Sequence, residues 1–172
     1  MAQTFTQYNS GVAFAATKIM GGILNGHATE VLKIRRVGLL NGQTAGVTGV
    51  LCNLELRKIE GAGAWAGAVA GQITSHDSTN TAPTTYTQGN SGTTPTGTPT
   101  TMRRTNWSSD EAAASSATSD ELECLVPLNI LYDWQPHSDI QPLTLRQNQI
   151  GYVFNISGAA GLLDVWIEFT KE

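Results

Sequence analysis

The sequence has few charged side chains. Asp, Glu, Lys and Arg make up 14% of its 172 residues, against about 25% in average soluble domains. The polar surface must therefore come largely from Thr, Ser, Asn, Gln and Gly. The formal net charge of −4 gives no reason to expect binding to nucleic acid or to an anionic membrane. A chain of this length is expected to form one domain with a sizeable hydrophobic core.

Cysteines and long apolar runs are also scarce. Cys52 and Cys124 are the only cysteines, and neither lies in a CxxC motif or in a cluster with metal-ligand spacing. Both alternate with apolar neighbours, so we expect buried free thiols and assembly in a reducing cytoplasm. No apolar run is long enough to predict a transmembrane helix. Residues 1–26 lack the basic start and continuous apolar stretch of a secretory signal peptide.

Sequence motifs for catalysis and for cofactor binding are missing. There is no GxSxG elbow, no Walker loop and no GxGxxG after a strand. The histidines do not form the pattern of a metal-binding β-barrel, in which two histidines spaced by one residue precede a Glu. His76-Asp77 is the one pair suited to acid–base chemistry, whereas His27 and His137 stand alone. We predict that the protein is not an enzyme and holds no cofactor or metal.

What the sequence has is alternation of apolar and polar residues with a period of two, which is typical of β-strands. Counting from residue 30, this pattern predicts eight strands, at about 30–40, 47–59, 67–75, 100–107, 122–132, 142–147, 149–157 and 162–170. Eight antiparallel strands with some long loops are typical of a jelly-roll, in which two sheets face each other. We therefore predict an all-β, eight-stranded antiparallel jelly-roll sandwich over residues 30–172. A sandwich with another strand order would give the same periodicity.

A Thr-rich stretch interrupts this pattern. Residues 78–101 contain eleven threonines and no charged residue. Thr favours extended backbone, but Gly and Pro break regular pairing and the stretch offers little to bury. We therefore interpret residues 78–121 as a long Thr/Ser/Gly-rich loop inserted into the sandwich. Loops of this length are uncommon unless they are functional or disordered. Residues 108–123 form either a short helix or an ordered loop.

The first 29 residues carry large apolar side chains without a clear period. Such a segment either adds an edge strand to the sandwich or forms an extended arm that contacts another subunit. We predict an N-terminal arm over residues 1–29. Its candidate contacts are Phe5, Tyr8 and Phe14.

Two groups of basic residues are candidates for docking on an acidic protein surface. Lys33 and Arg35 share a face of one predicted strand, which is therefore not a core face. Arg103 and Arg104 precede Trp107, and an Arg with an adjacent aromatic makes a good interface anchor. Ordinary solvent exposure explains the same pattern.

Two stretches resemble a known family. The tail QPLTLRQNQIGYVFNISGAAGLLDVWIEFTKE, residues 141–172, resembles the closing strands of jelly-roll proteins of tailed-phage virions. The stretch VLKIRRVGLLNGQTAGVTGVLCNLELRKIEG, residues 31–61, followed by SHDS, resembles their opening strands and first loops. The tail departs from the family pattern at Asn148 and Gln149, where Gly and Glu are expected.

The resemblance implies a capsid decoration, or cement, protein. Such a protein is a non-enzymatic subunit, commonly a homotrimer, that binds the major capsid protein on the outside of an assembled phage head and stabilises it. It would be made in the host cytoplasm and end on the outer capsid surface of the virion. A receptor-binding or fibre-tip jelly-roll module is the alternative, with Trp107, Tyr86 and Trp134 as candidate contacts on exposed loops. A lectin-like domain would need a cleft or a metal.

Overall fold

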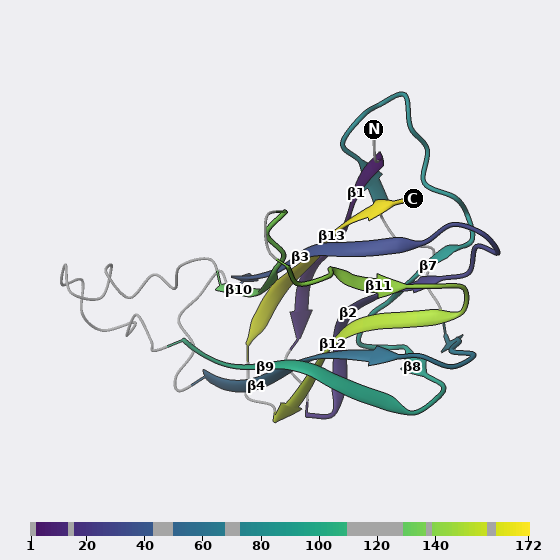
Figure 1. Ribbon diagram of the computed structural model, residues 1–172. Helices are drawn as coiled ribbons and strands as arrows, with labels where there is room; N and C mark the ends of the chain where they lie inside the picture. Colours follow the sequence, from purple (N-terminus) through teal and green to yellow (C-terminus); the bar gives the residue numbers. More distant parts are fainter. Residues whose placement is uncertain are drawn as a thin grey trace.

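The computed structural model describes residues 3–13, 16–42, 50–67, 73–109, 129–136, 139–157 and 161–172 (Figure 1). Within these ranges the chain forms thirteen β-strands and no helix. It follows that none of the ranges contains a helix long and apolar enough to cross a membrane.

Two antiparallel sheets contain most of these strands. Sheet A runs in the order β10 (Asn129–Asp133), β3 (Leu32–Asn41), β13 (Leu162–Lys171), β1 (Gln3–Ala13) and β6 (Ile73–Ser75), with β11 (Leu143–Leu145) also paired to β3. Sheet B runs in the order β7 (Tyr86–Gly89), β2 (Lys18–Asn25), β12 (Gln149–Ser157), β4 (Val50–Ile59) and β9 (Pro99–Ser109). A two-stranded ribbon joins β5 (Trp65–Ala66) to β8 (Thr94–Pro95).

The two sheets have matching strand orders. Read from the β10 edge of sheet A and the β9 edge of sheet B, the strands correspond as β10 with β9, β3 with β4, β13 with β12, β1 with β2, and β6 with β7. Each of the five pairs consists of strands that are consecutive among the described strands, so the chain repeatedly crosses from one layer to the other. Figure 1 shows β3 and β11 above β12 and β9 in this view.

One apolar cluster fills the space between the sheets. It takes Phe5 and Phe169 from sheet A and Leu54, Leu56 and Val153 from sheet B, all fully buried. Phe5 lies opposite Phe169 in the β1–β13 register, and their rings stack with centroids 5.6 Å apart. Burying apolar side chains from both layers in one cluster holds the sheets face to face as a β-sandwich.

The predicted all-β antiparallel class is confirmed, and the predicted strand number is wrong. Each of the eight predicted strands overlaps an observed one, although β6, β10 and β11 are shorter in the described residues than predicted. Five further strands occur, namely β1, β2, β5, β7 and β8.

The segment predicted as an arm, residues 1–29, forms β1 and β2 instead. β1 pairs with both β13 and β6, and β2 pairs with both β12 and β7, so both strands lie inside their sheets. The period was hidden because Gln7 and Asn9 occupy inward, buried positions of β1. On β2 every residue from Ile19 to Asn25 is buried, so polar and apolar positions do not alternate.

The loop predicted over residues 78–121 is also partly wrong. Its Thr-rich first half contains β7 and β8, which were not predicted, whereas β9, which begins at Pro99, matches the strand predicted at about 100–107. The backbone of Thr-rich strands can pair with neighbours without contributing large apolar side chains. Residues 110–128, which include Cys124 and most of the possible helix at 108–123, lie outside the described residues.

A candidate docking face on sheet A

The outer face of sheet A carries the side chains that alternate with the core residues. On β13 the core positions are buried, while Asp164, Trp166 and Glu168 point to the other side of the sheet and are partly exposed. No other described strand lies over this outer face. The face is therefore available to a partner within the part of the chain that the structure describes.

An apolar row crosses this face. Tyr8 lies opposite Trp166, Trp166 lies opposite Gly38, and Gly38 lies opposite Ile130, so four strands contribute to one line. Tyr8, Ile130 and the nearby Leu40 are 39%, 41% and 39% exposed. The ring of Trp166 lies directly over Gly38, where an added Cβ would come within 2.0 Å of it. We call Tyr8, Trp166, Ile130 and Leu40 the apolar row.

A carboxylate fixes one end of the row. The Tyr8 hydroxyl donates to Asp164 Oδ2 at 2.5 Å, and the Gly11 amide donates to Asp164 Oδ1 at 2.6 Å. Gly11 has φ +59° and lies in a bulge of β1, where the register against β13 shifts. The hydrogen bond to Asp164, together with burial and the carboxylate charge, raises the pKa of Tyr8 to about 12. Tyr8 is therefore held in a defined orientation as a neutral phenol.

A charged band runs beside the apolar row. Glu168 lies opposite Arg36 and Arg36 lies opposite Asp133, so three strands again contribute. Arg36 Nε donates to Asp133 Oδ1 at 3.1 Å, and this bond raises the pKa of Arg36. The register of β3 against β13 shifts between Arg36 and Ile34, which leaves Arg35 as an extra residue. This bulge lets Arg35 join Arg36 on the outer face.

Arg35 packs on an aromatic ring, a pairing that was expected from the sequence for Arg103 and Arg104 beside Trp107 and not for Arg35. Its guanidinium carbon lies 4.3 Å from the centroid of Trp134, a cation–π distance. Arg35 Nε also donates to Thr170 Oγ1 at 2.9 Å, and the Trp134 indole donates to the Ile140 carbonyl at 2.6 Å. An open hollow of about 420 Å³ lies beside Trp134, and its wall also contains Arg35, Arg36, Asp133 and Glu168. We call Arg35, Arg36, Asp133, Trp134 and Glu168 the charged band.

The structure brings together three of the eight predicted contact residues. Tyr8, Lys33 and Arg35 all lie on the outer face of sheet A, where Lys33 forms an ion pair with Glu172. Phe5 was expected on an arm, but it is fully buried against Phe169 and cannot be a surface contact. Phe14 lies outside the described residues.

The remaining predicted contacts lie on the other sheet. Arg103 and Arg104 belong to β9, at the edge of sheet B. Arg103 is exposed, whereas Arg104 Nε binds Glu55 Oε1 at 2.9 Å. Trp107 lies on β9 opposite Cys52, but the side chains of both residues fall outside the described part of the chain.

Sequence reasoning missed Trp166, Ile130, Asp133 and Glu168 as site residues. An outward Trp between two acidic positions of a strand is a signal that was available for Trp166. Ile130 and Asp133 become part of the face only through the pairing of β10 with β3, which periodicity does not reveal.

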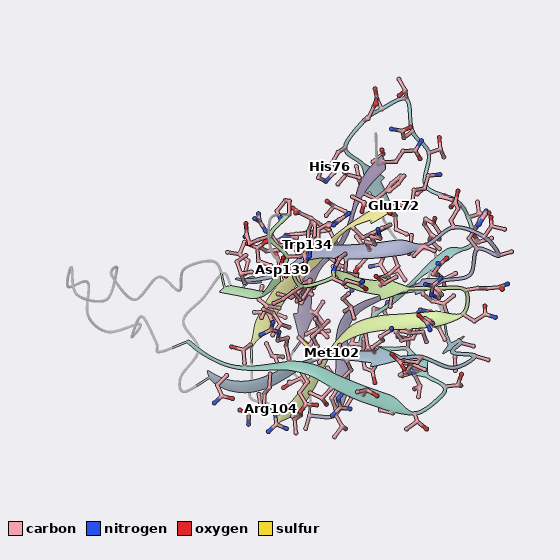
Figure 2. All side chains as sticks on the ribbon, viewed as in Figure 1. His76, Met102, Arg104, Trp134, Asp139 and Glu172 are labelled. Carbon is pink, nitrogen blue, oxygen red and sulfur yellow. The ribbon has the colours of Figure 1, made fainter. Side chains whose placement is uncertain are left out.

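Two other predicted features have ordinary hydrogen-bond partners. The His76 ring bonds to Thr6 Oγ1 at 2.6 Å, while Asp77 Oδ1 accepts from the Thr79 amide at 2.9 Å (Figure 2 labels His76). Tyr86, a candidate contact of the receptor-binding alternative, is buried and donates to Glu30. His137 lies outside the described residues, and the described residues contain no cluster of three His, Cys, Asp or Glu side chains suited to a metal.

Comparison with models of protein families, with curated proteins and with solved structures found no match in any of the three.

Proposed function

We propose that this chain is a structural virion protein that binds the outer surface of an assembled phage capsid and stabilises it. The observation that carries the proposal is the outer face of sheet A, where the apolar row lies beside the charged band. Both groups contain side chains that could anchor a partner protein. Exposed aromatic residues and an aromatic-backed Arg are the side chains that dominate protein–protein binding energy. The resemblance of residues 31–61 and 141–172 to jelly-roll virion proteins supports the capsid as the partner.

The architecture favours the same proposal. Consecutive strands that face each other across the two layers are a feature of jelly-rolls, and on this ground we propose that the sandwich is a form of that fold. A face built from four neighbouring strands is broad and rigid, and it suits a flat, repeated surface such as a capsid lattice. A protein that binds only the assembled lattice stabilises it by mass action.

The partners in this proposal are the major capsid protein and further copies of this chain. Decoration proteins commonly sit as homotrimers at local symmetry axes, and we propose a homotrimer here. The protein would then be located on the outer capsid surface of the virion after synthesis in the host cytoplasm. Nothing in the charged band suggests nucleic acid as a partner, because it contains both signs of charge.

The experiment is a binding assay with heads that lack the protein. Purified protein should sediment with expanded, empty heads and raise their disruption temperature. Ile130→Asp places a carboxylate in the apolar row and should reduce head binding at least about tenfold, since burying one unpaired charge costs more than about 1.4 kcal/mol. Thr84→Asp, which adds the same charge at an exposed loop position, is the matched control and should bind normally.

Two results would contradict the proposal. One is failure of the native protein to bind heads, and the other is normal binding by Ile130→Asp. Binding to host cells in place of heads would favour a receptor-binding or fibre-tip module. The hollow beside Trp134, with Arg36, Asp133 and Glu168 in its wall, is the feature that fits that second role.

A further inference from the structure

One side of the sandwich is open between the edges of its two sheets. Sheet B ends there with β9, which pairs with β4 on one side and with no other described strand on the other. Sheet A ends there with β10 and β11, which both pair with β3. β9 is eleven residues long, and its residues 99–104 are exposed. An edge strand of this length offers a row of backbone donors and acceptors to an added strand.

A groove lies between these edges. It consists of two open hollows of about 420 and about 770 Å³, which share Lys58, Gln141, Pro142 and Thr144 in their walls. The two hollows therefore adjoin along these four residues, and we call them together the groove. Figure 2 labels Met102, which lies on β9 and lines the smaller hollow.

The smaller hollow has several apolar residues in its wall. Its wall includes the core residues Leu56 and Leu143, the ring of Tyr132, and the exposed side chains of Met102 and Ile140. Met102 is 46% exposed and Ile140 is 66% exposed. An apolar side chain inserted between them would reach the edge of the core, and its burial there would favour binding.

The charges along the groove favour an acidic occupant. The wall of the smaller hollow contains Lys58 and Arg103 and no carboxylate. In the larger hollow Lys33 and Lys58 are paired with Glu172 and Glu60, whereas Arg146 is not. Among the described residues, neither Arg103 nor Arg146 has a carboxylate within ion-pair distance.

We propose that this groove binds an extended, acidic and apolar segment of a partner protein, which adds to β9 as a further strand of sheet B. Backbone hydrogen bonds to β9 would supply part of the affinity. One apolar side chain would fill the hollow at Met102 and Ile140, and carboxylates would pair with Arg103 and Arg146. If the proposed function holds, a capsid subunit carries the segment, but the chemistry of the groove does not depend on that identity.

The test uses the full chain and synthetic peptides. The probe is the blocked hexapeptide VEVEVE, in which apolar and acidic residues alternate as a strand requires, and the control peptide is VKVKVK. Amide chemical shifts of the ¹⁵N-labelled protein are followed during titration. The acidic peptide should shift amides of β9 and β11 at millimolar or lower concentration, and the basic peptide should leave them unchanged.

Charge-reversed variants sharpen the test. Arg103→Glu combined with Arg146→Glu should weaken binding of VEVEVE at least about tenfold, since two charge-assisted contacts are lost. Both side chains are exposed, so the fold should tolerate the change. Lys18→Glu, a single charge reversal at an exposed site away from the groove, should bind VEVEVE with only slightly reduced affinity, and each of Arg103→Glu and Arg146→Glu alone should weaken binding more than it does.

Several outcomes would overturn the proposal. They are no shifts with VEVEVE, shifts confined to other strands, or equal binding of VKVKVK. Concentration-dependent shifts of the β9 amides without peptide would identify a second copy of this chain as the occupant instead. Slow hydrogen exchange along the outer edge of β9 in the free monomer, with no peptide binding, would show that the chain's own residues fill the groove. None of these outcomes bears on head binding through sheet A, which is scored separately with Ile130→Asp.

Discussion

The two outer faces of the sandwich differ in what covers them. On sheet B the ribbon of β5 and β8 lies over the face, and Trp65 packs against Tyr152 in an edge-to-face contact with centroids 6.1 Å apart. On sheet A no described strand covers the apolar row. The chain thus uses part of its own length to bury one face and leaves comparable apolar side chains on the other.

Glycines permit both arrangements in different ways. An added Cβ at Gly22 or Gly89 would come within 3.0 or 2.5 Å of the Trp65 ring, so these glycines make room for a side chain from a separate element. Gly38 makes room for Trp166, which belongs to the neighbouring strand of the same sheet. Trp65 therefore covers the outer face of sheet B, whereas Trp166 lies flat on the outer face of sheet A and leaves that face exposed. A broad, flat apolar row is suited to contact with another protein.

The largest expected effect is on the covered face. Trp65→Ala should lower the free energy of unfolding by about 3 kcal/mol, because the indole fills the space above Gly22, Gly89 and Tyr152. Trp166→Ala on the open face should cost less than half of that. Urea unfolding of both variants measures the difference. Equal losses would mean that the two faces do not differ as described.

The buried carboxylate of sheet B is expected to come next. Glu55 is 3% exposed and binds Arg104 and Arg57. Glu55→Gln should cost about 2 kcal/mol, since it removes the charge from both bonds. Gln keeps the size of the side chain, so the loss reports the charge. A change below about 0.5 kcal/mol in urea unfolding would contradict this role.

The same carboxylate gives a pH dependence. Burial alone would raise the pKa of Glu55, but the hydrogen bonds from Arg104 and Arg57 outweigh it and lower the pKa below the usual value. A lowered folded pKa means that this stability is present above the unfolded pKa and is lost as the pH falls through the folded one. The free energy of unfolding of the native protein should therefore decrease as the pH falls below about 4. Glu55→Gln should flatten this part of the profile.

A smaller effect is expected on the open face at Tyr8. Tyr8→Phe removes the hydrogen bond to Asp164 and should cost about 1 kcal/mol, because the site is partly exposed. The raised pKa of about 12 means that the bond stabilises the fold below the unfolded pKa and is lost as the pH rises through the folded one. Ultraviolet titration should show one tyrosine fewer titrating near pH 12 in the variant. An unchanged titration would contradict the Tyr8–Asp164 bond.

β-Strands could be predicted from the sequence most easily where one face of the sheet is exposed to solvent and the other is buried. β13 alternates cleanly because its outer face is open. β12 and β4 alternate in sequence, although residues 150–153 and 54–56 are all buried in the structure. β2 could not be found in this way, since the sandwich core covers one side of it and the β5–β8 ribbon the other. β1 was obscured by Gln7 and Asn9, polar residues at buried positions.

The candidate face could be predicted only in part. Lys33 and Arg35 were assigned to an outward face from local spacing, and the structure places them there. The apolar row depends on long-range register, because Tyr8, Trp166 and Ile130 are far apart in sequence. Periodicity gives the face of a residue within its own strand, but it does not give the neighbouring strand.

A map of decorated heads at side-chain resolution tests the central claim most directly. We expect the outer face of sheet A, with Trp166 and Ile130, to be buried against the major capsid protein, and the β5–β8 ribbon over sheet B to face outward. A bound protein whose apolar row points into solvent would contradict that claim.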